Sequence, residues 1–125
     1  MERLAPNLFV KDINASIEFY KSLGFLTVVT MPEAVPYDWA MLVNGSVTIM
    51  LQTMTSLGNT LPQIHREPGG SLLLYINMQN IQQFYDGFVY KDAILTSLET
   101  TFYGAVEFSA LDPDGFVITF AENNN

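Results

Sequence analysis

The sequence predicts an α+β fold built from two tandem βαβββ modules, which form a curved mixed sheet around a cavity with the helices outside. The order strand, helix and three strands occurs twice along the chain. Asn44-Gly45, the strongest short hairpin signal, lies between two strand-like runs of the first copy. In addition, Val10-Lys11-Asp12-Ile13 before Phe19-Tyr20 is echoed by Met78-Gln79-Asn80-Ile81 before Phe84-Tyr85. These observations indicate a duplicated unit.

The first module begins with a strand and an amphipathic helix. Apolar residues recur at helical spacing from Ile13 to Leu23, with Asp12 or Asn14 as the N-terminal cap and Gly24 as the stop. The expected strands of this module are residues 4–10, 25–30, 39–43 and 47–52.

A connector rich in Gly and Pro separates this module from the second one. The second helix is expected from Ile81 onward, with an apolar face that continues to Phe88. The expected strands are residues 71–78, 93–98, 105–111 and 116–121. We therefore expect a single domain over residues 1–125, with modules at about 1–53 and 70–122 and the connector at 54–69.

Composition excludes several classes of protein. Thirteen acidic residues against five Lys and Arg give a net charge of -8, which opposes nucleic-acid binding because phosphates need clustered cations. The absence of cysteine excludes disulfides, thiolate catalysis and Cys-ligated metals. The acidic charge either keeps the protein dispersed or attracts a cationic ligand.

The apolar segments are too short for a membrane protein. None approaches the roughly 20 residues that a spanning helix needs. Met1-Glu2-Arg3-Leu4 leads into a strand pattern without the apolar core of a signal peptide. We therefore expect a cytoplasmic protein with no membrane partner.

Both ends of the chain resemble a known superfamily. Val10-Lys11-Asp12 with Ile17-Glu18-Phe19-Tyr20 and Leu23-Gly24-Phe25 looks like the opening of the glyoxalase/bleomycin resistance protein/dioxygenase (vicinal oxygen chelate) superfamily. Tyr103-Gly104-Ala105-Val106-Glu107-Phe108 followed by Asp112-Pro113-Asp114-Gly115 resembles its closing signature. The resemblance implies the fold described above and a homodimer.

The resemblance also implies four metal-ligand positions, and none of them carries a strong ligand here. Relative to the matching motifs, the positions fall at Ala5, Met50, Leu73 and Thr119, with Gln52 replacing Met50 if the register differs by two residues. These side chains are poor ligands for the hard or borderline cations of such enzymes. The only histidine, His65, lies in the connector, where we expect a solvated side chain rather than a catalytic base. We therefore expect no metal, no cofactor and no catalytic residue.

Strand alternation identifies a candidate ligand-binding surface. Residues two positions away from the four ligand positions share their face of the sheet. Together with aromatic residues that we expect at the cavity mouth and one acid beside them, the candidate ligand-binding residues are Asn7, Phe9, Trp39, Thr48, Met50, Gln52, Tyr75, Asn77, Phe102, Tyr103, Glu107 and Thr119. The alternative is that these residues fill a core or a dimer contact.

The pattern favours a metal-independent binding protein of the glyoxalase/bleomycin-resistance type. Its partner is expected to be a small organic ligand, aromatic or cationic and similar to an antibiotic, which an apolar pocket with a few polar groups sequesters. One alternative is a divalent-metal-dependent lyase, isomerase or dioxygenase of the same superfamily. Another is a structural or regulatory subunit without catalysis.

Overall fold

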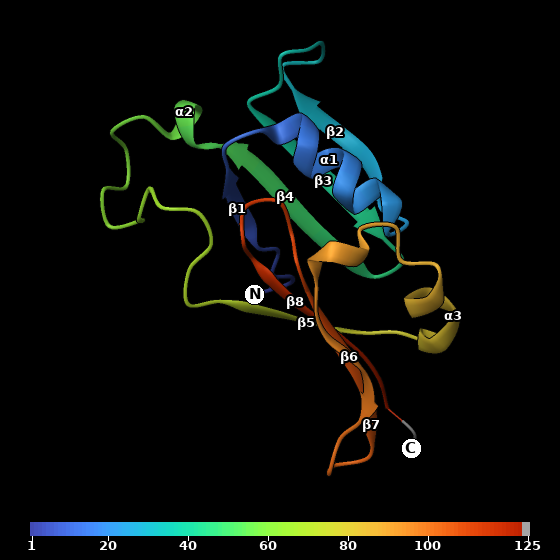
Figure 1. The fold of residues 1–125 in the computed structure, drawn as a ribbon. Coiled ribbons are helices and arrows are strands. Elements are labelled where there is room, and N and C mark those ends of the chain that lie inside the picture. The colour runs from blue at the N-terminus through green and yellow to red at the C-terminus, as the bar shows by residue number, and fades with distance from the viewer. Residues whose placement is uncertain (124–125) are drawn as a thin grey trace. The chain divides into compact units, whose positions relative to one another are not determined.

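The chain forms two compact units, Met1–Pro68 and a second that begins at Gly69. The structure, a computed structural model, describes residues 1–123. Each unit contains one strand, one main helix and three further strands, as Figure 1 shows. The predicted α+β class with two βαβββ modules is therefore confirmed, and each module forms a four-stranded mixed sheet of its own.

Unit 1 has a sheet with the strand order β1-β4-β3-β2. Strand β1 runs parallel to β4, and the other neighbours are antiparallel. Its elements are β1 (Asn7–Val10), α1 (Ile13–Ser22), β2 (Leu26–Met31), β3 (Trp39–Asn44), β4 (Val47–Thr53) and α2 (Met54–Leu57).

Helix α1 begins and ends at residues that the sequence indicated. The Asp12 carboxylate accepts a hydrogen bond from the Ala15 backbone N–H at 3.1 Å, so Asp12, and not Asn14, is the cap. Gly24 follows the C-cap with φ of 102°, a backbone angle that side chains disfavour. A Cβ there would also lie 3.1 Å from the amide nitrogen of Asn44, which donates to the Leu23 carbonyl.

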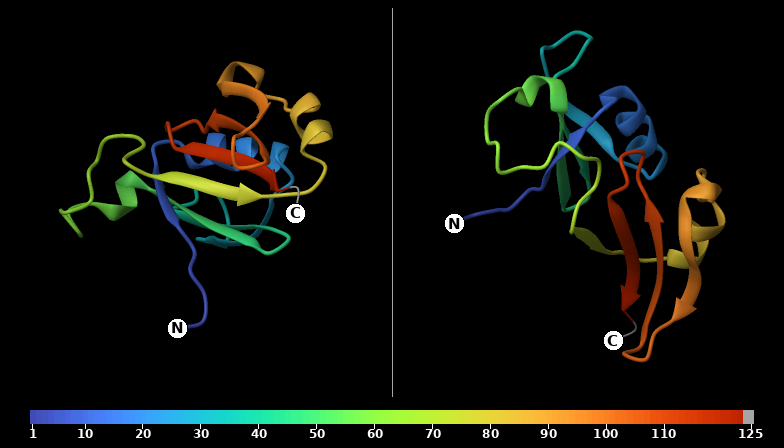
Figure 2. Two further views of the ribbon diagram at one scale, coloured as in Figure 1. Left: turned by 90° about the horizontal axis from the view of Figure 1, so that it is seen from below. Right: turned by 60° about the vertical axis from the view of Figure 1, so that its left-hand side comes forward.

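One face of the unit 1 sheet packs against α1. Alternate residues of β1, β3 and β4 are buried on this face, which follows from the alternation of side chains along a strand. Tyr20 lies at the centre, with its ring edge-on to both Phe19 and Phe25. The buried strand residues are Leu8, Val10, Ala40, Leu42, Ile49 and Leu51. The opposite face of this sheet carries no helix of unit 1 (Figures 1 and 2).

Unit 2 repeats the arrangement with the strand order β5-β8-β7-β6, in which β5 is parallel to β8. Its elements are β5 (Leu73–Asn77), α3 (Ile81–Asp86), the 3-10 helix η1 (Lys91–Ala93), β6 (Ile94–Thr100), β7 (Ala105–Leu111) and β8 (Val117–Asn123). Phe84 and Phe88 pack against Phe108 and Phe120 with ring centroids 4.9 to 6.1 Å apart. This aromatic cluster is the core between α3 and the sheet.

Several predicted boundaries were wrong by a few residues. Strand β1 starts at Asn7 rather than residue 4, because its pairing with β4 begins at Asn7 and Leu4 is exposed. Helix α3 ends at Asp86, before Phe88, because the following Gly87 closes the helix as its C-cap. Helices α2 and η1 were not predicted from the sequence, because they are too short to show a period.

The Asp112 side chain holds the turn between β7 and β8. The Asp112 carboxylate accepts hydrogen bonds from the backbone N–H groups of Asp114 and Phe116, each at 2.9 Å. Gly115 adopts φ of 84°. Over residues 1–123, no helix is long and apolar enough to cross a membrane.

Candidate functional site

The predicted site residues of unit 1 all lie on one face of its sheet, the face away from α1. We call it the unit 1 helix-free face, and it contains Asn7, Phe9, Trp39, Met41, Thr48, Met50 and Gln52. Strand pairing arranges these residues in rows. Gln52 lies between Phe9 on β1 and Trp39 on β3, and Met50 lies between Asn7 and Met41. The result is a surface of rings and thioethers around two amides.

The two amides of this face bond to each other. The Asn7 side-chain nitrogen donates to the Gln52 side-chain oxygen at 3.0 Å, across 45 residues of sequence. The Asn7 side-chain oxygen is buried and has no hydrogen-bond partner among the described residues. A buried acceptor of this kind is uncommon in folded proteins.

The predicted site residues of unit 2 fall into two groups. Tyr75, Asn77, Glu107 and Thr119 lie on the sheet face away from α3, which we call the unit 2 helix-free face. Phe102 and Tyr103 lie in the loop between β6 and β7, with their rings edge-on at 4.9 Å. Phe102 is 99% exposed and packs against little else in the chain.

Two tyrosines converge on one carboxylate of this face. The hydroxyls of Tyr75 and Tyr103 each donate to the same oxygen of Glu107 at 2.6 Å. The hydrogen bond from Tyr75 to Glu107, followed by desolvation and the negative charge of Glu107, raises the pKa of Tyr75 from 10.0 to about 12. The hydrogen bond from Tyr103 to Glu107 likewise raises the pKa of Tyr103. The other oxygen of Glu107 accepts no side-chain hydrogen bond from residues 1–123.

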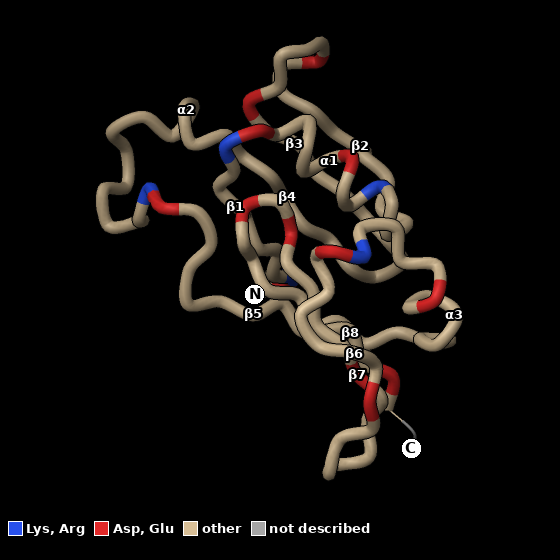
Figure 3. The backbone as a smooth tube through the Cα atoms, viewed as in Figure 1, with Lys and Arg blue, Asp and Glu red and all other residues tan. Residues whose placement is uncertain are grey.

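The surroundings of Glu107 are acidic. Glu99 lies directly opposite Glu107 in the pairing of β6 with β7, and like charges in such positions repel. From Gly69 to the end, the sequence contains Lys91 as its only Lys or Arg and seven acidic residues. Figure 3 shows the acidic positions along the strands of unit 2. The face therefore favours positive charge.

The remaining polar groups of the unit 2 helix-free face are paired internally. The hydroxyls of Ser109 and Thr119 are 2.8 Å apart, and the Asn123 amide donates to Asn77 at 2.8 Å. Their hydrogen-bonding capacity is partly used within the fold.

The positions implied for metal ligands do not suit a metal. Met50 lies on the unit 1 helix-free face, Leu73 is the first residue of β5, Thr119 bonds to Ser109, and Ala5 precedes β1. These four positions therefore carry a thioether, an isobutyl group, a hydroxyl and a methyl group. None of these is a strong ligand for a hard divalent ion. In the described part of the chain, no three His, Cys, Asp or Glu residues are grouped to hold a metal ion.

Two other polar residues, His65 and Asp38, lie outside both helix-free faces. His65 is exposed in the connector. Asp38 is exposed just before β3, and its backbone N–H and carbonyl link it to Met31 and Thr53.

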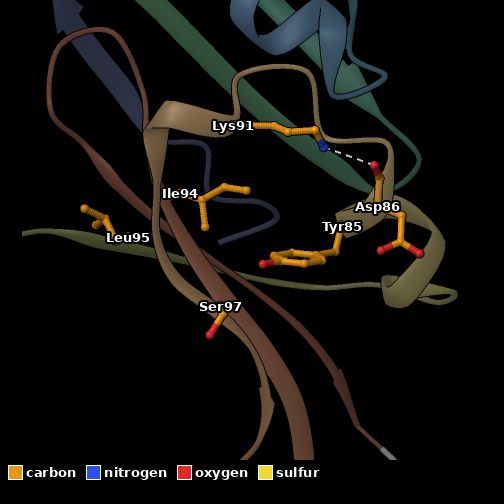
Figure 4. A pocket seen from close by; sticks show the side chains of 6 residues that line it. All are labelled: Tyr85, Asp86, Lys91, Ile94, Leu95 and Ser97. Carbon is orange, nitrogen blue, oxygen red and sulfur yellow. Dashed lines mark hydrogen bonds between the residues drawn. The ribbon is translucent and has the colours of Figure 1, made fainter.

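A hollow of about 470 Å³ in unit 2 was not predicted from the sequence. It is lined by Tyr85, Asp86, Lys91, Ile94, Leu95 and Ser97, from the end of α3, η1 and β6. The Lys91 ammonium donates to the Asp86 carbonyl at 3.1 Å, as Figure 4 shows. The 3-10 turn that brings Lys91 to this place has no sequence period, so only the folded structure reveals the hollow.

The sequence profile of the Glyoxalase/Bleomycin resistance protein/Dioxygenase superfamily matches residues 3–120. This chain belongs to that superfamily. The recognition made from the terminal motifs is therefore confirmed. No curated protein has a significantly similar sequence.

Solved structures share the fold of this superfamily member. A protein of unknown function from Agrobacterium tumefaciens is 23% identical with a TM-score of 0.78, over 98% of this chain and 94% of that one. The virulence protein STM3117 from Salmonella typhimurium is 24% identical with a TM-score of 0.72, over 98% of both chains. A bleomycin-binding protein in complex with bleomycin is 18% identical with a TM-score of 0.68, over 99% of this chain and 100% of that one. At these identities, the likeness establishes the fold.

Proposed function

We propose that this protein is a metal-independent small-molecule-binding protein that captures an organic ligand with aromatic and cationic groups. The observation that carries the proposal is the Tyr75–Glu107–Tyr103 cluster, in which a carboxylate with one free oxygen lies beside aromatic rings. An ammonium or amidinium group placed there gains a charge-assisted hydrogen bond. Each ring face that it contacts adds about 0.5–1 kcal/mol of cation–π attraction.

The unit 1 helix-free face supports the same role. Phe9, Trp39, Met41 and Met50 supply ring and thioether surface, which by itself suits an apolar or aromatic ligand group. The nonligating side chains at the four implied metal positions support metal independence. The fold is compatible with capture, because the bleomycin-binding protein shares it.

The test combines composition and binding. Native mass spectrometry and elemental analysis of gently purified protein give the bound metals and organic masses, and calorimetry measures metal-free bleomycin binding with and without chelator. We expect less than stoichiometric metal and binding that chelator leaves unchanged. Stoichiometric zinc, nickel, manganese, iron or copper contradicts the proposal and favours a lyase, isomerase or dioxygenase.

A matched pair of variants tests the carboxylate. Glu107→Gln keeps an acceptor for both tyrosines but removes the charge, and we expect it to weaken the binding of a cationic probe about tenfold. Asp92→Asn removes one exposed charge of η1 from the same unit and serves as the control. Equal effects of the two variants would assign the attraction to net charge alone. If neither the wild type nor either variant binds the cationic probe, the result favours the alternative function of a structural or regulatory subunit.

A further inference from the structure

One amide pair in unit 1 has hydrogen-bonding capacity that the fold does not use. The Asn7 side-chain nitrogen is bonded to the Gln52 oxygen, while the Asn7 oxygen is buried without a partner in the described chain. The Gln52 side-chain nitrogen likewise donates to no residue from 1 to 123. The pair therefore leaves one acceptor and one donor unpaired.

This arrangement does not depend on which way the two amides are turned. If both amides rotate by half a turn, Gln52 donates to Asn7, and the free groups become the Gln52 oxygen and the Asn7 nitrogen. In both cases one acceptor and one donor remain. The pair thus keeps the capacity for two more hydrogen bonds, which a ligand with a donor and an acceptor of its own could make.

The unused oxygen distinguishes this face from that of unit 2. There, the amides of Asn77 and Asn123 and the hydroxyls of Ser109 and Thr119 bond to each other. Unit 1 retains an acceptor that burial has removed from water, which destabilises the unliganded fold. A ligand that donates to this oxygen removes the penalty.

The side chains beside the pair define the shape of the ligand. Phe9 and Trp39 lie opposite Gln52 on the two neighbouring strands, and Met50 lies opposite Asn7. Two flat rings and a flexible thioether around an amide edge suit a planar group.

We propose that Asn7 and Gln52 bind the donor–acceptor edge of a planar ligand, such as a lactam or a ring carboxamide, with its ring packed against Phe9 and Trp39. This inference rests on the proposed function, because it names the chemical class that the unit 1 helix-free face recognises. It is independent of the carboxylate cluster of unit 2.

Matched probes test the edge. 4-Methyl-2-quinolinone has a ring N–H and a carbonyl side by side, whereas 1-methyl-2-quinolinone has the same size and ring but lacks the N–H. Trp39 is the only tryptophan of the chain, so its fluorescence reports binding at this face. We expect the 4-methyl isomer to bind at least about tenfold more tightly, because the 1-methyl isomer leaves the Asn7 oxygen unpaired.

The double variant Asn7→Leu/Gln52→Met replaces both amides by apolar side chains of similar size. We expect the two probes to bind it within about twofold of each other, and its thermal unfolding midpoint to be no lower than that of the wild type. Asn59→Leu/Gln63→Met makes the same changes at exposed connector residues and should retain the wild-type preference.

Three results would overturn the inference: equal binding of both probes by the wild type, no binding of either, or a preference that survives in the double variant. If bleomycin is captured in any of these cases, the proposed function stands and only the amide edge is refuted. If the probe preference is found but cationic ligands do not bind, the amide edge stands and the cationic part of the proposed function fails.

Discussion

At the scale of residues, the two helix-free faces differ in how their polar groups are used. Glu107 accepts two phenol hydroxyls at one oxygen, so its geometry is held while its charge stays available. Asn7 and Gln52 form one hydrogen bond and leave a buried acceptor unpaired, a state that costs roughly 1–3 kcal/mol. The first arrangement suits a cation, and the second suits a hydrogen-bond donor.

The titration of Tyr75 is a first prediction at this scale. Its pKa is raised from 10.0 to about 12 in the folded protein, mainly because its hydroxyl donates to Glu107. The folded state therefore favours the neutral phenol. Its contribution to folding stability is complete below pH 10.0 and is lost as the pH rises toward about 12.

Ultraviolet absorbance of tyrosinate measures this titration as the difference between the wild type and Tyr75→Phe. We expect Glu107→Gln to move the pKa of Tyr75 down toward 10.0, because the charge that opposes ionisation is gone. An unchanged titration in Glu107→Gln would mean that the negative charge of Glu107 does not control Tyr75.

At the scale of elements, the connector is held by one side chain. The Arg66 guanidinium donates to the backbone carbonyls of Gly58, Thr60, Leu61 and Ile64. These carbonyls belong to a segment that has no neighbouring strand to pair with them. The planar guanidinium carries several N–H donors and can bind several carbonyls at once. Arg66 thus takes the place of secondary structure in this segment of unit 1.

We predict that Arg66→Lys loosens this segment, because one ammonium cannot reach carbonyls spread over seven residues as a guanidinium does. Thermolysin cleavage near Leu61 and Ile64 should accelerate at least about threefold. Arg3→Lys, near the exposed N-terminus, is the control. Equal cleavage of wild type and Arg66→Lys would show that the four hydrogen bonds do not limit opening.

At the scale of the whole molecule, apolar surface lies on the outer strand of unit 1. Strand β2 is at the edge of its sheet and exposes Leu26, Val28, Val29 and Met31. An exposed apolar edge strand is a template for association. The homodimer implied by the superfamily resemblance therefore has a candidate surface on β2.

We predict a native mass of twice the 14.0 kDa chain mass. Leu26→Lys should shift the protein toward the monomer in sedimentation experiments, because it places a charge on the edge strand. Leu4→Lys adds the same charge at an exposed residue outside the strands and should leave the mass unchanged. A wild-type monomer would contradict the prediction.

Local sequence patterns determined the strands, the two main helices and the side of the sheet on which each strand residue lies. Asp12, Gly24 and the Asn44-Gly45 turn act through neighbours along the chain, so their roles could be predicted without the fold. The alternation of strand residues likewise predicted that Asn7 and Gln52, or Tyr75 and Thr119, share faces.

Only the tertiary structure decided which of these residues meet. The Asn7–Gln52 hydrogen bond requires the parallel register of β1 and β4, and the Tyr75–Glu107 hydrogen bond requires β5 to pair with β8 and β8 with β7. Such registers are set by packing between segments far apart in sequence, which no local period encodes. For the same reason, the unpaired oxygen of Asn7 and the hollow beside Lys91 became visible only in the folded chain.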